Sequence, residues 1–489
     1  MSSYAKLGQK TIFEGKAHMT KRNENWALAA SALGLIGGYA VGRLLTKSTP
    51  ATDGALPRAS VLDTVALAID VMAPTFAKGV IIRRPAVVAM AEQLQLDKRA
   101  VQRMQKLRNK YGQGPLMLPL PVRKQAVVLA PEHVHRVLNE SPDPFSPASS
   151  EKRAALSHFE PEGVLISQGA LRDERRRFNE DVLESDRAVH HMAQRFLPMV
   201  DEETARILAH ARRKGELDWD AFASGWYRLV RRVVFGDGAA GDQELNDMTV
   251  ELRRAANWAF LHPKKKQVQA RFFARIQDYL DRAEPGSLAA VIARTPQTAD
   301  TKPVQQVPQW LFAFDAAGMA TFRALALLAT HPEQAARARQ EIRERAGLER
   351  KLLPFLRATL LESVRLWPTT PAILRQSTRA TEWDQGTMPA RTGVLVFTPF
   401  FHRDDQRLPH ANGFTPELWL HERTDAQWPL VPFSGGPAVC PARHLVQMLS
   451  SAMLAALIDG REPRLVSRQK MVPGRLPGTL NNYGLRFAV

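Results

Sequence analysis

Two kinds of apolar run occur along this chain, and they predict different secondary structure. Long runs with helical spacing lie at 97–111, 131–137, 186–294, 310–328, 352–366 and 442–458. Short apolar runs predict strands and a turn at 116–120, 125–129, 373–374, 394–398, 401–404, 464–466 and 485–489. The pattern therefore predicts a mainly α-helical protein, in which a large helical domain carries a small β-sheet region.

The N-terminal part contains an uncharged apolar segment, 26–42, with basic residues on both sides. Its 17 residues are at the short limit for a membrane span, and glycines dilute its apolar character. Two alternatives stay open: a membrane anchor, or a segment that packs on the domain or forms a loose tail. Residues 46–58 are rich in Pro, Thr and Gly and predict a linker. We therefore expect a tail over 1–58 and one folded domain over 59–489.

Composition narrows the class of partner. The net charge of +18 over 489 residues, with a pI near 10.2, favours an acidic partner. The chain has no helix-turn-helix signature, zinc-finger spacing or basic patch interleaved with aromatic residues, which argues against nucleic acid. A single cysteine cannot form an internal disulfide, so we expect a reducing compartment such as the cytoplasm, with membrane association through 26–42 as an addition.

That single cysteine, Cys440, lies where a loop meets a helix. Gly435, Gly436 and Pro437 predict an irregular loop before it, and Pro441 and an apolar helix follow it. A lone cysteine is commonly just a small buried hydrophobic residue. At a helix N-terminus, however, free N–H groups and the helix dipole favour a thiolate. Such a thiolate would be a nucleophile or a metal ligand.

The sequence around Cys440 resembles a known family. Phe433, Gly436 and Cys440 match the F-x-x-G-x-x-x-C signature of the cytochrome P-450 superfamily of haem-thiolate monooxygenases. The resemblance implies the cytochrome P-450 fold and heme b, with Cys440 as the axial thiolate ligand of the iron. Two positions depart from the family pattern: Ala438 replaces a common basic partner of a haem propionate, and Ala442 replaces a glycine.

A second matching motif lies in the apolar helix at 310–328. Ala317, Gly318 and Thr321 fit the A/G-G-x-acid-T pattern of the family's oxygen-binding helix. The resemblance implies that the glycine makes room over the haem and that the Thr321 hydroxyl bonds to bound oxygen. From chemistry alone, Thr321 can also bond back to the carbonyl four residues earlier. The acid is missing because its position is Ala320, and Asp315 is expected to face elsewhere.

The helix at 352–366 contains Glu362 and Arg365, which lie one turn apart and can form an ion pair. Their place before a Pro-rich segment and upstream of the cysteine loop resembles the family's structural E-x-x-R motif. A later family arginine completes this group, but Leu418 stands at its position here, which leaves a pair unless another residue substitutes.

Two arginines are candidates for holding the haem propionates. On an early helix, the family carries a Trp or His, an arginine directly after it, and a second arginine four residues after the Trp or His. Leu171, Arg172 and Arg175 fit these positions. The resemblance implies that Arg175 binds a propionate. Internal pairing within this charged helix is the plain alternative. Arg375 follows Arg365 by ten residues, near the position of a further family arginine.

The resemblance implies a haem-thiolate catalytic domain over 59–489 that inserts one oxygen atom from O₂ into a small apolar substrate. No flavin motif is visible and one cysteine cannot hold an iron–sulfur cluster, so electrons must come from a separate donor. The basic charge suits an acidic ferredoxin- or flavodoxin-type donor. Two alternatives stay open. The first is a peroxide-dependent peroxygenase or a non-oxygenating haem-thiolate enzyme, and the second is a non-enzymatic, membrane-anchored helical protein in which Cys440 is merely structural.

Overall fold

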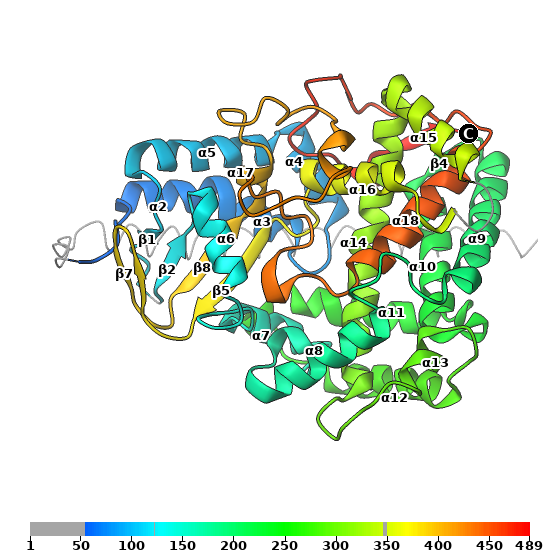
Figure 1. Cartoon of the computed structure of the whole chain (residues 1–489), viewed down its shortest axis with the longest axis horizontal. Coiled ribbons are helices and arrows are strands. Elements are labelled where there is room, and N and C mark those ends of the chain that lie inside the picture. Colours follow the sequence, from blue (N-terminus) through cyan, green and yellow to red (C-terminus); the bar gives the residue numbers. More distant parts are fainter. Residues whose placement is uncertain (1–53, 122, 346–349) are drawn as a thin grey trace, which may run out of the picture.

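The computed structural model describes residues 54–121, 123–345 and 350–489, so the apolar segment 26–42 lies outside the described residues. The helices are α2 (Val61–Leu67), α3 (Ala73–Lys78), α4 (Pro85–Gln93), α5 (Leu96–Tyr111), α6 (Pro131–Asn139), α7 (Ser150–Leu156), α8 (Gly169–Leu183), α9 (Ala193–Lys214), α10 (Trp219–Phe235), α11 (Gln243–Ala256), α12 (Lys266–Arg282), α13 (Leu288–Ile292), α14 (Pro303–Thr330), α15 (Pro332–Glu344), α16 (Pro354–Leu366), α17 (Thr398–His402) and α18 (Arg443–Ile458). These helices make up most of the described chain, so the predicted mainly α-helical class is confirmed (Figure 1).

The strands form small sheets. They are β1 (Leu116–Leu118), β2 (Gln125–Val127), β3 (Phe145–Ser146), β4 (Leu217–Asp218), β5 (Ala372–Ser377), β6 (Thr381–Trp383), β7 (Gly386–Met388), β8 (Gly393–Phe397), β9 (Arg464–Leu465) and β10 (Arg486–Ala488). The five-stranded sheet has the order β1-β2-β8-β5-β3, and β2 and β8 pair in parallel while the other neighbours are antiparallel. Strand β8 is buried along its whole length, which explains its uninterrupted apolar sequence.

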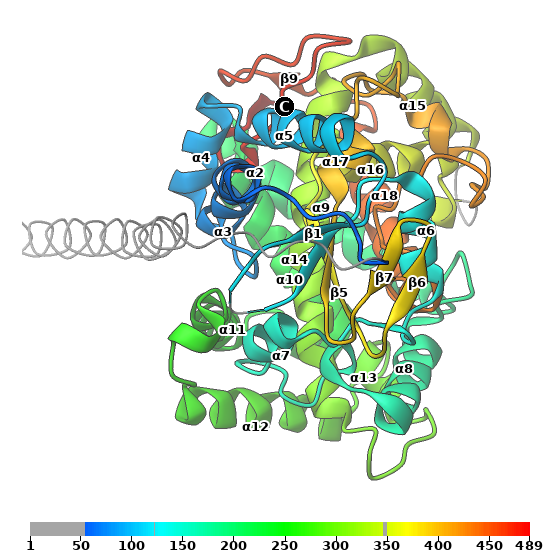
Figure 2. The ribbon, with the colours of Figure 1, turned by 90° about the vertical axis from the view of Figure 1, so that its left-hand side faces the viewer.

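The helical part has α14 at its centre, in contact with α10, α12, α15, α16 and α18 (Figures 1 and 2). Helix α14 is long and apolar enough to span a membrane by composition, but 78% of its apolar window is buried inside the protein. A helix that is apolar on all sides is what a core position requires. Helices α9, α10, α14 and α18 pack on one another and form the largest apolar core.

Local differences from the sequence predictions have simple causes. Residues 398–402 form the short helix α17 rather than part of a strand and turn, with Pro399 in its first turn, where a missing N–H has no cost. Pro441 lies in the turn before α18 and not in the helix itself, which begins at Arg443. The last strand pair is present as β9 and β10, and β4 adds a third strand to it.

Candidate functional site

The loop that carries Cys440 is folded tightly against α6. The backbone N–H of Cys440 donates to the carbonyl oxygen of Phe433 at 3.0 Å, which closes the loop. Gly436 has a φ of +61°, and a Cβ there would overlap the carbonyl of Leu138 at the end of α6. Only glycine meets both conditions, so the motif's glycine is required by the approach of the loop to α6.

Cys440 is a partly exposed residue at the end of this loop, and it packs against the main apolar core. Burial raises the pKa of Cys440, while the N–H of Ala442 and the charges of Arg176 and Arg443 act in the opposite direction. The helix end therefore favours a thiolate as expected, through the N–H of Ala442, but desolvation acts in the opposite direction and is the larger effect. A metal cation at the sulfur would reverse this balance, so the thiol suits a metal ligand better than a free nucleophile.

Helix α8 directs two arginines, one turn apart, at the cysteine loop. Arg176 donates to the carbonyl oxygen of Val439 at 2.7 Å, and Arg172 lies 3.4 Å from that of Pro437. Their spacing of four residues places both on the same face of the helix. Arg172 belongs to the register expected from the family pattern, but the second arginine at the loop is Arg176 and not the expected Arg175.

Arg175 turns away from the loop. Its guanidinium donates to the Ser167 hydroxyl at 2.8 Å and to the Asp300 carbonyl at 2.9 Å, and it pairs with Glu162 at 3.2 Å. The structure therefore does not bring Arg175 to the cysteine loop. The register was read one residue out of phase, because four arginines in six positions fit more than one helical face.

Arg375, in β5, reaches the cysteine loop from the sheet. It donates to Ser141 at 2.9 Å and to Ser434 of the loop at 3.2 Å. Burial lowers the pKa of Arg375 to about 10, and Arg172 adds repulsion. Burial also lowers the pKa of Lys152 to about 7, again with repulsion from Arg375. Within the described part of the chain, neither Arg375 nor Lys152 has a carboxylate partner.

We call Lys152, Arg172, Arg176 and Arg375 the loop cation cluster. Arg176 pairs with Glu180 at 2.6 Å and Arg172 lies 3.9 Å from Asp173, so Arg375 and Lys152 are the members without a carboxylate. Buried cations without anions are costly, and the negative carboxylates of an organic cofactor would compensate them. Haem b combines an iron that accepts a thiolate with two propionate groups, so Cys440 and the loop cation cluster fit both ends of this cofactor. Lys152 belongs to no sequence motif. It is identified as a candidate only because the structure lowers its pKa by burial and gives it no carboxylate partner among the described residues.

The E-x-x-R residues form a fully buried pair. Arg365 donates to the Glu362 carboxylate at 2.6 and 2.7 Å, and its other hydrogen bonds go to backbone carbonyls of residues 402–413. The family arginine that would complete this group is absent, and two other donors replace it. The indole N–H of Trp419 and the backbone N–H of Thr415 each donate to the Glu362 carboxylate at 2.9 Å. Trp419 thus occupies the bonding role that Leu418 cannot fill.

On α14, the Thr321 hydroxyl donates to the Ala317 carbonyl at 2.8 Å, so the predicted back-bond is confirmed. Gly318 faces α10, where a Cβ would lie 2.7 Å from the Trp226 ring. The contact that requires glycine here is therefore with Trp226. Ala320, at the position of the missing acid, packs against α16 in an apolar cluster.

Asp315 also faces away from position 320, as expected. It pairs with Arg253 of α11 at 2.6 Å and accepts a hydrogen bond from Tyr227 of α10. The carboxylate is thus committed to a buried link between three helices, and it does not replace the missing acid.

Comparison with known proteins gives consistent results. A family model described as Cytochrome P450 matches residues 83–281 and 298–469. Cytochrome P450 81D1 of Arabidopsis thaliana is 32% identical over 144 residues, 28% of each chain, and the beta-amyrin 24-hydroxylase of Glycine max is 30% identical over 151 residues, 28% of this chain and 29% of that one. The chain spans about a third or less of the length of the curated relatives it matches first.

Solved structures agree over a larger part of the fold. The cytochrome P450 CYP102L1 matches with a TM-score of 0.63 at 19% identity, over 79% of this chain and 93% of that one. A retinoic acid-bound cyanobacterial CYP120A1 matches with a TM-score of 0.63 at 17% identity, over 78% and 93%. At these identities the likeness concerns the fold.

The role of Trp419 can be tested by its replacement with Phe. Trp419→Phe removes one of the two donors to Oε2 of the buried Glu362, which keeps only the hydrogen bond from Nε of Arg365. Because a hydrogen bond to a buried charged group is lost, we expect a loss of about 1–3 kcal/mol in the free energy of unfolding. Urea denaturation followed by circular dichroism measures it. Trp258→Phe is the matched control, because within the described residues the half-buried indole of Trp258 donates no hydrogen bond. Equal stability of the two variants would contradict the assignment.

Proposed function

Because the chain belongs to the cytochrome P450 family, we propose that it is a haem-dependent monooxygenase acting on a small apolar substrate with O₂ and an external electron donor. The family matches support haem-based oxidation in general. The observation that carries the proposal is the position of Cys440 in a loop that Arg176 and Arg375 of the loop cation cluster contact. The name of one relative, a hydroxylase of beta-amyrin, supports oxygen insertion into an apolar compound.

In this proposal, residues of α7, α8, β5 and the cysteine loop would hold the cofactor. Cys440 would ligate the iron through its thiolate, and the N–H of Ala442 would moderate the charge on the sulfur. The loop cation cluster binds the propionates, for which the forked guanidinium of Arg375 is well suited. When bound, haem supplies reductive activation of O₂ with transfer of one oxygen atom to the substrate.

Two residues of α14, Thr321 and Ala320, determine whether this helix can supply protons. Thr321 holds a proton on Oγ1, which is engaged with the Ala317 carbonyl at 2.8 Å and becomes available when that bond breaks. Ala320 cannot carry a proton and lies against apolar side chains of α16. Position 320 therefore cannot relay a proton to Thr321. This feature favours a second candidate function, oxygenation driven by peroxide, because hydrogen peroxide brings its own protons and electrons.

The electron donor is expected to bind near Cys440, since that surface offers the shortest route to the iron. Arg443 begins α18 immediately after the loop and is partly exposed. Arg461 follows the far end of the same helix, roughly 25 Å away at about 1.5 Å per residue. The two arginines therefore cannot belong to one small contact, and Arg443 is the better candidate for an acidic ferredoxin or flavodoxin.

The reaction can be tested with isotopically labelled O₂. The full chain, loaded with haem, is incubated with ferredoxin, ferredoxin reductase, NADPH and a panel of apolar compounds, and products are analysed by mass spectrometry. We expect a product that contains one labelled oxygen atom and depends on the reductase. Equal product from unlabelled hydrogen peroxide without reductase would support the peroxide candidate and contradict the proposal.

Docking can be tested by charge reversal. Arg443→Glu is expected to slow the reduction of the iron by ferredoxin by about tenfold at low salt, with a smaller effect at high salt, because charge complementarity mainly raises association rates. Arg461→Glu is the control at the other end of α18. Stopped-flow absorbance measures both rates. A similar slowing in both variants would point to net charge rather than to a docking site.

A further inference from the structure

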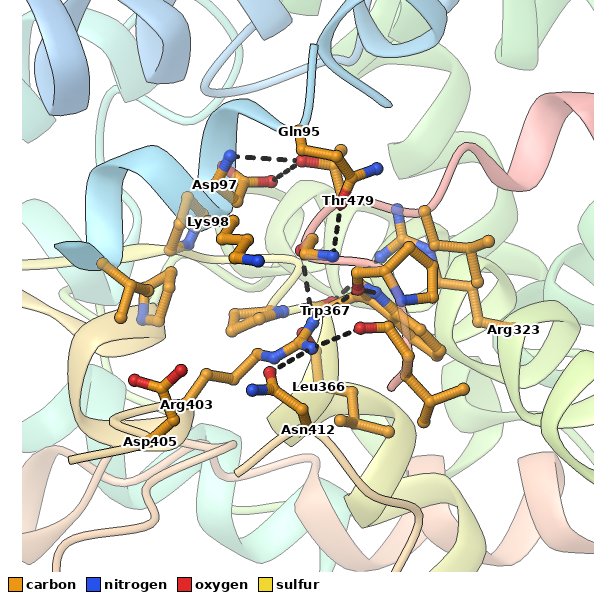
Figure 3. Close-up of a pocket in the computed structure, with 18 of the residues that line it drawn as sticks. Gln95, Asp97, Lys98, Arg323, Leu366, Trp367, Arg403, Asp405, Asn412 and Thr479 are labelled. Atoms are coloured by element: carbon orange, nitrogen blue, oxygen red, sulfur yellow. Dashed lines mark hydrogen bonds between the residues drawn. The ribbon is translucent and has the colours of Figure 1, made fainter. Parts of the chain in front are cut away.

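A cavity of about 450 Å³ lies apart from the cysteine loop, between the N-terminal helices and the C-terminal segment (Figure 3). Helices α3, α4 and α5 contribute one side, the end of α16 with residues 366–371 contributes another, and residues 474–480 close it. The cavity shares no residue with the loop cation cluster or with residues 433–440. The function proposed above therefore leaves it unexplained.

Two buried arginines line the cavity. Arg323 of α14 is 7% exposed and Arg403, just after α17, is 5% exposed. Arg403 is held by backbone carbonyls of residues 366 and 476–478 and by the side chain of Asn412 at 2.7 Å (Figure 3). Arg323 donates to the Trp367 carbonyl at 2.9 Å and to the Asn482 side chain at 3.0 Å.

Neither arginine has a carboxylate partner in the part of the chain that the structure describes. The Nε of Arg323 is buried without any hydrogen-bond partner. Burial lowers the pKa of Arg323 to about 10 and that of Arg403 to about 9. Nearby Arg83 and Arg365 add repulsion, which Asp97 and other more distant carboxylates offset only in part. A buried cation without an anion is destabilising. An anion that entered the cavity would relieve this cost.

The charges at the wall of the cavity are mostly positive. Lys98 and Arg475 are exposed and also lack carboxylate partners among the described residues. Asp97 is already paired with Lys78, and Asp405 accepts a hydrogen bond from Gln105 at 2.8 Å. These two carboxylates offset only part of the positive charge, because the lining also contains the cations Lys78, Arg83, Lys98, Arg323, Arg403 and Arg475. The cavity therefore remains cationic.

Much of the remaining lining is apolar, beside the polar side chains of Gln95, Gln102, Asn412 and Thr479. The apolar part includes Val88, Val101, Leu366, Trp367, Leu476 and Leu480. Such a surface binds an apolar body, and the volume is in the range that holds a small organic molecule. The combination of buried cations and apolar walls indicates an amphiphilic anion rather than an inorganic ion.

We propose that this cavity binds an organic carboxylate with an apolar chain, at a site separate from the cysteine loop. Arg323 and Arg403 provide the positive charge at its floor, and Lys98 and Arg475 attract the carboxylate at its mouth. The site stands on its own residues, so it does not depend on the oxygenation reaction.

Isothermal titration calorimetry of the full, haem-loaded chain with octanoate tests this proposal. The control ligand is 1-octanol, which has the same chain length and no charge. We expect octanoate to bind with about tenfold or greater preference, because only the carboxylate compensates the buried cations. The double variant Lys98→Glu/Arg475→Glu should weaken octanoate binding by about tenfold or more. Both residues are exposed, so the fold should be unaffected.

Two controls make the outcome decisive. The variant Arg212→Glu/Arg213→Glu makes the same change of charge at exposed positions of α9, outside the cavity, and should bind octanoate as the unmodified protein does. Octanoate should also bind when imidazole saturates the iron, as judged from the Soret band. Equal binding of 1-octanol, unchanged binding in Lys98→Glu/Arg475→Glu, or loss of binding with imidazole would each overturn the proposal.

Discussion

The buried pair of Glu362 and Arg365 fixes the segment that leads to the cysteine loop. Arg365 binds carbonyl groups from residues 402–413, and Glu362 accepts from Thr415 and Trp419. The connection continues toward the loop, because the N–H of Val431 donates to the ring of His402 at 2.9 Å. Neither charge can be lost alone without leaving the other unpaired in the interior, where it would be strongly destabilising. The position of Cys440 therefore depends on this pair.

Uncompensated positive charge is the second organising feature. Among the described residues, Arg375 and Lys152 near the cysteine loop have no carboxylate partner, and neither do Arg323 and Arg403 at the cavity between α5 and the C-terminal segment. The net charge of +18 is therefore not only a surface property. Part of it is held inside the fold, where it indicates anionic groups: haem propionates at the first pair and an organic carboxylate at the second.

The sequence predicted the large elements well and the orientation of single residues less well. Helices α5, α14, α16 and α18 were predictable because their apolar periodicity is long. The choice of Arg175 was wrong in register, since neighbouring arginines differ only by the helical face they occupy. Trp419 and Lys152 could not be found, because their roles depend on contacts with residues far away in the sequence. The buried position of Arg323 could not be predicted either, because it depends on hydrogen bonds to Trp367 and Asn482, which are distant in the sequence.

The central claim is that Cys440 ligates a haem iron, and one spectrum tests it directly. The full chain, purified after expression with ample haem supply, is reduced with dithionite and exposed to carbon monoxide. A strongly red-shifted Soret band, lost in Cys440→Ser, is the predicted result because only a thiolate ligand produces that shift. A protein without haem absorbance, or a Soret band that is the same in Cys440→Ser, would contradict the account.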